Sequence, residues 1–246
     1  MILDTAIAEV QQICGWRSDK ATQIQNALQY AQTEREKPNR TYPWFLRAFN
    51  PSAFVLTQGL ATYSLPSDFI EESEESEGNM MIFLDVDGVS VLPGSPTSTQ
   101  FRTVFLKKQN YKYAQERYFG EWPYTITNPP DAIMDTGSFV SAGVPVDYVL
   151  LGSGIVFYPV PSQTFYVAWA YWKQDATQAL GQENLWLKNA PWVLIGDAAA
   201  KICADLGNEA GKATALALSQ SASDNLFRAT VNRKEAGKRR SMGSRL

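Results

Sequence analysis

Residues 146–172 of the chain read VDYVLLGSGIVFYPVPSQTFYVAWAYW, and this stretch decides the fold. Two apolar runs of strand length, 146–151 and 155–158, flank the turn Gly152-Ser-Gly154, and a third run, 165–172, follows two prolines. Short apolar runs separated by glycine and proline are typical of antiparallel strands. We therefore predict a β meander, with the aromatic residues of 165–172 in a core rather than in a stacking platform for nucleic acid.

The same texture extends over residues 52–175, where glycine, proline, threonine, valine and aromatic residues are frequent. The segments 53–57 and 61–65 predict one hairpin. Residues 81–92 predict two strands joined near Asp87-Gly88, a dipeptide favoured in tight hairpin turns. One or two helical turns are expected at 110–118.

Apolar residues recur at helical spacing on both sides of this region. Two N-terminal faces consist of Leu3, Ala6, Ile7, Val10, Ile13 and Cys14, and of Ala21, Ile24, Ala27, Leu28 and Ala31. A C-terminal face, with Pro191 in its first turn, consists of Trp192, Ile195, Ala199, Ile202, Cys203 and Leu206. A break at Gly207-Asn208 precedes an alanine-rich helix that is expected to reach about Thr230.

These blocks predict an α+β fold, in which a helical bundle built from N- and C-terminal helices carries an inserted antiparallel β domain. The expected boundaries are 1–50 and 183–230 for the discontinuous bundle, 51–182 for the β-rich domain and 231–246 for a basic C-terminal arm. Such a bundle would place Cys14 and Cys203 in one core, where both thiols are expected to pack as small apolar groups.

The composition excludes several kinds of catalytic site. Among 246 residues there is no histidine, which removes Ser-His-Asp and Cys-His catalysis and histidine-ligated zinc. Two cysteines are too few for a zinc site made of several thiolates. The longest apolar run, Met80–Leu84, is far shorter than the ~20 residues of a membrane span, and no signal peptide is recognisable. We expect no enzyme activity, no cofactor, no metal and no membrane partner.

Charge is distributed unevenly along the chain. The formal net charge is −3, but residues 228–246 hold seven basic residues and one acid, a net +6, which leaves −9 on residues 1–227. A basic tail on an acidic body is typical of a segment that binds nucleic acid or an acidic protein surface. A solvated terminus is the third interpretation, and the residues alone do not decide between them.

One short motif suggests an enzyme. Residues 81–89, MIFLDVDGV, resemble the first motif of the haloacid-dehalogenase-like phosphatases. That resemblance would make Asp85 the nucleophile and Asp87 the general acid/base, both beside magnesium. No helix of a doubly wound α/β domain follows, so the residues favour a hairpin with an Asp-Gly turn.

A second acidic feature is the run from Asp68 to Glu77, which holds six carboxylates in ten residues. It lacks the alternating ligands and central glycine of a calcium loop. We therefore expect a solvated loop whose charges repel one another, or a surface that faces a basic partner.

Several segments, taken in order, resemble the phage head-to-tail adaptor proteins. Residues 57–69, TQGLATYSLPSDF, are similar to a hairpin of that family, and Tyr148, Leu150, Gly152 and Tyr158-Pro159-Val-Pro161 are similar to its later meander. The segment 183–191 resembles the return of that family to its helical bundle. The resemblance covers most of residues 53–230.

The resemblance implies a non-enzymatic virion protein made in the host cytoplasm. Members of the family form a homo-oligomeric ring, commonly a dodecamer, between the portal protein and the tail nozzle protein, and DNA passes through the channel without specific binding. The β domain would face the nozzle, and the C-terminal arm would bind the portal. By this resemblance the portal-binding residues are Arg228, Arg233, Lys234, Lys238, Arg239, Arg240, Arg245 and Leu246. A magnesium-dependent phosphatase that uses Asp85 and Asp87, or a DNA-binding protein that uses the basic tail, are the alternatives.

Overall fold

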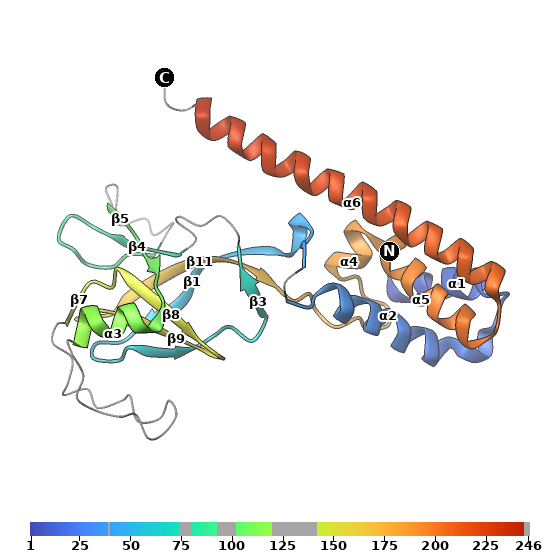
Figure 1. Ribbon diagram of the computed structural model, residues 1–246, viewed down its shortest axis with the longest axis horizontal. Helices are drawn as coiled ribbons and strands as arrows, with labels where there is room; N and C mark the ends of the chain where they lie inside the picture. The colour runs from blue at the N-terminus through green and yellow to red at the C-terminus, as the bar shows by residue number, and fades with distance from the viewer. Residues whose placement is uncertain (39, 74–79, 93–101, 120–141, 244–246) are drawn as a thin grey trace. The chain divides into compact units, whose positions relative to one another are not determined.

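The computed structural model describes residues 1–38, 40–73, 80–92, 102–119 and 142–243, with residues 115, 119 and 234–243 described by their backbone alone (Figure 1). The fold is α+β, as the sequence predicts. The chain divides into a helical unit, Met1–Arg47 with Trp172–Leu246, and a β unit, Ala48–Tyr171. The chain therefore leaves the helical unit once and returns to it once.

The helical unit contains helices from both ends of the chain. They are α1 (Leu3–Ile13), the 3₁₀ turn η1 (Ser18–Lys20), α2 (Ala21–Arg35), the 3₁₀ turn η2 (Trp44–Leu46), α4 (Leu185–Asn189), α5 (Pro191–Asp205) and α6 (Glu209–Gly243). The predicted N-terminal faces are largely buried: Leu3 and Val10 of α1 and Leu28 of α2 have no exposed surface. In the predicted C-terminal face, Ile195, Ala199 and Cys203 are buried, but the prediction is wrong for Trp192, which is 40% exposed in the first turn of α5. The Asn184 side chain accepts a hydrogen bond from the Leu187 amide and so caps α4.

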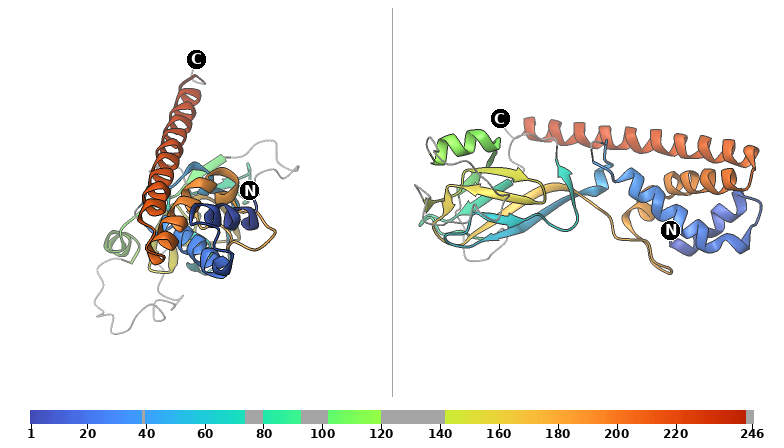
Figure 2. Two further views of the ribbon diagram at one scale, coloured as in Figure 1. Left: turned by 90° about the vertical axis from the view of Figure 1, so that its right-hand side faces the viewer. Right: turned by 60° about the horizontal axis from the view of Figure 1, so that its bottom comes forward.

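Helix α5 lies at the centre of this unit and contacts α1, α2, α4 and α6 (Figure 2). Small residues allow the close approach of α6. A Cβ atom added at Gly196 of α5 would lie 2.7 Å from the Ser219 Cβ and 2.8 Å from the Ala215 carbonyl oxygen of α6. Only glycine fits at this crossing without moving the α6 backbone.

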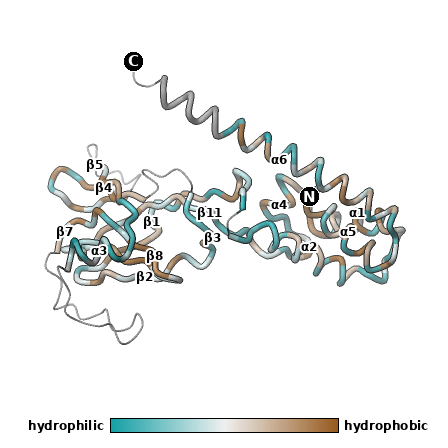
Figure 3. Tube along the Cα trace, in the orientation of Figure 1, coloured by the Kyte–Doolittle hydropathy of each residue, from teal (hydrophilic) through white to brown (hydrophobic). Residues whose placement is uncertain are grey.

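The predicted end of the last helix at about Thr230 is wrong, because α6 continues through the expected arm to Gly243. Hydrophobic and hydrophilic residues alternate along its described part without a long apolar run (Figure 3). Its buried residues, Ala215, Ser219 and Thr230, recur at helical spacing and face the unit. Within the described ranges, no helix has the length and apolarity needed to cross a bilayer.

The β unit contains two main sheets. The first consists of β1 (Arg47–Leu56), β11 (Phe165–Lys173), β4 (Met80–Leu84) and β5 (Arg102–Phe105) in that order, with β3 (Phe69–Glu72) also paired to β11. The second has the order β2 (Thr62–Ser64), β9 (Gly154–Tyr158), β8 (Asp147–Leu151) and β6 (Lys107–Lys108). A parallel pair, β7 (Ala142–Gly143) with β10 (Val160–Pro161), and helix α3 (Tyr111–Phe119) complete the described elements.

The structure confirms the hairpin of β8 and β9, in which Leu151 pairs with Gly154. It corrects two other predictions of strand pairing. Segment 53–57 belongs to β1 and segment 61–65 contains β2, but these strands pair with β11 and β9 in different sheets and not with each other. The third run of the predicted meander, β11, likewise leaves the β8–β9 sheet for the other one.

Aromatic side chains from both sheets form the core of the β unit. The Phe54 ring of β1 lies 5.4 Å from the Phe157 ring of β9 and 5.6 Å from the Trp169 ring of β11. Phe69 stacks on Trp169 with ring centroids 4.9 Å apart. The predicted core role of the aromatic strand 165–172 is thereby confirmed, since Phe165 and Trp169 are fully buried.

The crossing of α5 and α6 generates a test. Gly196→Ala should gain helix propensity yet destabilise the chain by about 1–3 kcal/mol, because its methyl group overlaps Ser219 and the Ala215 carbonyl. Urea unfolding of the full chain, followed by helical circular dichroism, measures this. The matched variant Ala204→Gly, on the exposed face of α5, should lose about 1 kcal/mol through propensity alone. A Gly196→Ala protein more stable than the parent would contradict the close approach.

Candidate functional site

The basic segment expected to bind a partner lies on α6. Arg228 and Arg233 are exposed residues of this helix. The Arg233 guanidinium carbon lies 3.5 Å from the centroid of the Trp44 ring in η2, a cation–π contact that joins the C-terminal helix to the segment after α2. Arg233 therefore has a partner inside its own unit. Lys234, Lys238, Arg239, Arg240, Arg245 and Leu246 lie outside the residues with described side chains.

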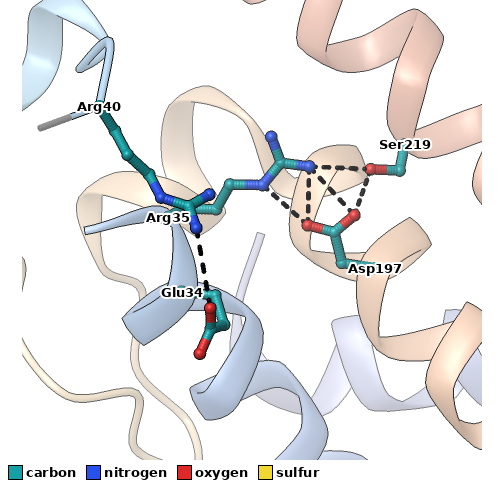
Figure 4. A network of polar contacts seen from close by, with 5 residues as sticks. All are labelled: Glu34, Arg35, Arg40, Asp197 and Ser219. Atoms are coloured by element: carbon teal, nitrogen blue, oxygen red, sulfur yellow. Dashed lines mark hydrogen bonds and ion pairs between the residues drawn. The ribbon is translucent and has the colours of Figure 1, made fainter. Parts of the chain in front are cut away.

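A network of hydrogen bonds connects α6 with α2 and α5 (Figure 4). Arg35, at the end of α2, donates from Nε to Asp197 Oδ2 over 2.8 Å and from Nη2 to Asp197 Oδ1 over 3.1 Å. Arg35 also donates to the Ser219 hydroxyl of α6, which itself donates to Asp197. Two parallel N–H···O bonds fix the orientation of the planar guanidinium as well as its position. The network thus links α2, α5 and α6.

A groove of about 440 Å³ lies beside this network in the helical unit. Its wall includes Arg35, Arg40, Tyr42, Trp186, Phe227 and Thr230. The buried Ser223 hydroxyl also lines it and has no hydrogen-bond partner among the described residues. Arg40 lies 3.8 Å from Glu34. The groove brings together basic, acidic, apolar and hydroxyl groups, Asp224 supplying the carboxylate.

A buried carboxylate joins α2 to the segment that returns from the β unit. Glu36 is 7% exposed, and its Oε1 accepts from Trp186 Nε1 over 2.7 Å, from Gln32 Nε2 over 3.2 Å and from the Asp175 amide over 3.3 Å. Burial raises the pKa of Glu36, although these hydrogen bonds act in the opposite direction. One oxygen of this carboxylate thus accepts three hydrogen bonds, and none of these three donors is a cation.

Two aspartates proposed for catalysis form a turn instead. The Asp85 side chain accepts from the Asp87 amide over 3.0 Å and from the Val89 amide over 2.8 Å, and Gly88 has a φ of 79°. The preceding strand β4 pairs antiparallel with both β5 and β11, so the turn does not open a parallel α/β domain. The structure therefore contradicts the phosphatase interpretation and confirms the Asp-Gly turn. In the described ranges, no group of three or more potential ligands could hold a metal ion.

Two carboxylates of the acidic run, Asp68 and Glu72, accept hydrogen bonds from tyrosines and do not form a solvated loop. The Tyr148 hydroxyl donates to Glu72 Oε1 over 2.5 Å, and the Tyr171 hydroxyl donates to Asp68 Oδ1 over 2.9 Å. Burial, followed by the bond to Asp68, raises the pKa of Tyr171 to about 12. For Asp68 and Glu72 the prediction of a solvated loop is wrong; residues 74–77 lie outside the described residues.

A third phenol–carboxylate pair holds α3 against β8. The Tyr118 hydroxyl donates to Asp147 Oδ2 over 2.5 Å, and Gln109 donates to the other oxygen over 3.1 Å. Asp147 is 2% exposed, and Arg117 lies 3.4 Å from it. The sequence gives no signal for this set, because Tyr118 and Asp147 are separated by residues that show no periodicity.

The described residues form a discontinuous helical unit, an inserted β unit and a long C-terminal helix, and polar clusters join elements within the units. Phage head-to-tail adaptors are the class expected from the sequence. The family model described as SU10 adaptor protein matches residues 1–245, so the chain belongs to that family of phage adaptor proteins. A search of curated proteins found no match.

The Arg35–Asp197 pair is predicted to matter for stability. Asp197→Asn should destabilise the helical unit by about 1–2 kcal/mol, because the partly buried guanidinium loses a charged acceptor. Chemical denaturation of the full chain gives the free energy of unfolding. The control is Asp19→Asn, which removes an exposed pair with Arg17 and should leave the midpoint unchanged. Equal losses in both variants would contradict a structural role specific to Asp197.

Glu36 generates a prediction of pH dependence. Its folded pKa is raised above the usual value of 4.5, so the ionised form weakens folding at neutral pH and protonation relieves this as pH falls. Glu36→Gln keeps a carbonyl acceptor for the three donors and removes the buried charge. The variant should be as stable as the parent at pH 7 or more stable, by up to about 1 kcal/mol.

The difference in unfolding free energy between Glu36→Gln and the parent should shrink between pH 7 and pH 4.5, which thermal unfolding at several pH values measures. Glu36→Leu is the control that removes the acceptor: it leaves the buried Trp186 indole N–H unpaired and should destabilise at every pH. If Glu36→Gln loses stability at pH 7 and the loss disappears in acid, the carboxylate charge is favourable and the assignment is wrong.

Proposed function

We propose that the chain forms a ring, matched to the portal ring and commonly of twelve copies, that joins the portal protein to the tail nozzle protein of a phage particle. Membership of the SU10 adaptor family is the observation that carries this proposal. The discontinuous helical unit with an inserted β unit supports it, because such a chain can present one unit to each neighbouring ring. The protein would be located in the virion after synthesis in the host cytoplasm.

The proposed portal-binding element is the C-terminal end of α6. The segment 228–246 carries a net charge of +6, while residues 1–227 carry −9. An acidic partner surface would therefore attract the basic segment and repel the rest of the chain. A ring presents this segment in many copies, and multiple contacts raise the avidity of a weak individual contact. The helical backbone of 231–243 lowers the conformational entropy that binding would otherwise cost.

The acidic body fits a channel through which DNA moves. A net charge of −9 on residues 1–227 disfavours adhesion to phosphates, so DNA would pass without specific binding. We assign the β unit to the nozzle side of the ring, as the family resemblance implies. The proposed role requires neither cofactor nor metal.

Copy number is the first test of this role. Quantitative mass spectrometry of purified virions should give a ratio of this protein to the portal subunit of about one to one. Absence of the protein from the particles would overturn the proposal. A ratio far from one would overturn the matched ring.

The portal contact is tested by charge. The triple variant Lys238→Gln, Arg239→Gln, Arg240→Gln should weaken binding to purified portal rings at least tenfold and flatten the dependence of the dissociation constant on salt, because three cations leave the interface. The matched control neutralises three exposed lysines outside the arm: Lys107→Gln, Lys112→Gln, Lys188→Gln. Biolayer interferometry at two salt concentrations compares them. Equal weakening by both triples would show a bulk charge effect and contradict a portal-binding arm.

A further inference from the structure

Cys14 and Cys203 lie against each other in the core of the helical unit. Their Sγ atoms are 2.9 Å apart, and both thiols are free. A disulfide bond is about 2.05 Å long, so closure requires the sulfurs to move together by less than about 1 Å. Cys14 caps the C-terminal end of α1, whereas Cys203 lies on α5.

We propose that Cys14 and Cys203 form an intramolecular disulfide, an oxidation site that covalently joins α1 to α5. The placement is specific, because the two residues are 189 positions apart and are brought together only by the fold. Cys203 has no exposed surface, and Cys14 is 4% exposed at a helix end beside Gly15. Cys14 is therefore the thiol that an oxidant reaches first when the end of α1 opens.

The surroundings of the sulfurs favour an internal bond over a lasting adduct. A Cβ atom added at Gly211 of α6 would lie 2.9 Å from the Cys203 Sγ, and the Cys14 Sγ lies 3.5 Å from the Ala199 carbonyl oxygen. With both sulfurs packed this closely, a glutathione adduct can form only while the core is open. The second thiol is already in contact, so it resolves the adduct.

The oxidant is a small-molecule disulfide such as oxidised glutathione. The Cys14 thiolate attacks one sulfur of that disulfide, the glutathione S–S bond breaks, and one glutathione thiolate leaves. Cys203 gives its proton to solvent and attacks the Cys14 sulfur of the mixed disulfide. The Cys14–Cys203 bond forms, the second glutathione leaves as a thiolate, and both released thiolates take up protons. Two protein thiols are oxidised and one glutathione disulfide is reduced.

The rate of this exchange is set by opening of the core. Burial, followed by the neighbouring Cys203 thiol, raises the pKa of Cys14 to about 12, so the closed protein holds almost no thiolate at neutral pH. Oxidation is therefore slow in the folded chain and faster while the chain folds. In a reducing compartment the pair stays as thiols, and outside it the bond forms.

The bond would stabilise the helical unit by restricting the unfolded chain. It closes a loop that contains the whole β unit, and loops of this length give the larger disulfide effects. The midpoint of thermal unfolding of the helical unit is expected to rise by about 5–15 °C on oxidation.

Intact mass spectrometry tests the proposal on the full chain. The protein is refolded from urea in a mixture of oxidised and reduced glutathione, quenched in acid, freed of glutathione and then treated with N-ethylmaleimide in denaturant at neutral pH. The expected product lacks both hydrogens of the two thiols, a loss of roughly 2 Da, and takes up no maleimide. A product with two maleimides, or with one or two glutathione adducts, overturns the proposal.

Two controls separate the bond from other effects. Cys14→Ser leaves Cys203 without its partner, so that variant should take up one maleimide, show no loss of 2 Da and lose the thermal shift. Because the substitution itself can destabilise the fold, the unfolding temperature of the oxidised parent is also measured with and without dithiothreitol. The rise in unfolding temperature must disappear on reduction of the same sample; a rise that survives reduction contradicts the bond as its cause.

Discussion

The helical unit depends on the contact between α5 and α6 at Gly196. Because α5 is buried against four other helices, a side chain at this crossing would push α6 away and open the layer that holds Asp197 and Ser219. The N-terminal helices share their core with helices that follow the β unit, since the chain leaves this unit after Arg47 and returns at Trp172. Close packing of a glycine thus allows two distant segments to share one core while carrying an inserted unit between them.

The elements that could be predicted from the sequence are those specified by residues close together in the chain. The helices around 3–13, 21–35 and 191–205 and the β8–β9 hairpin arise from periodicity and a glycine turn, which act between near neighbours. The partner of β1 is β11, more than a hundred residues away, and no local signal specifies that pairing. For this reason the segments 53–57 and 61–65 suggested a hairpin that the folded chain does not form.

The same limit applies to the polar contacts. Asp68 and Glu72 belong to a run that looks solvated, yet each accepts a hydrogen bond from a tyrosine on a distant strand. Asp197 lies within an apolar helix face, and a charged residue on a core face needs a partner. That pattern indicates a buried ion pair, but it does not identify Arg35 at the end of α2 as the partner. The residue type thus indicates that a partner exists, while only the fold identifies it.

Helix α6 combines the two properties that an assembly protein needs. Its buried face, through Ser219 and Thr230, belongs to the core of the helical unit, and its backbone continues as helix into the basic segment. Arg233 on Trp44 adds a contact close to the point where that segment begins. A partner that binds the end of α6 therefore acts on an element anchored by the Asp197 network. Under the proposed role, force at the portal contact would pass into the packed core instead of being absorbed by a loose tail.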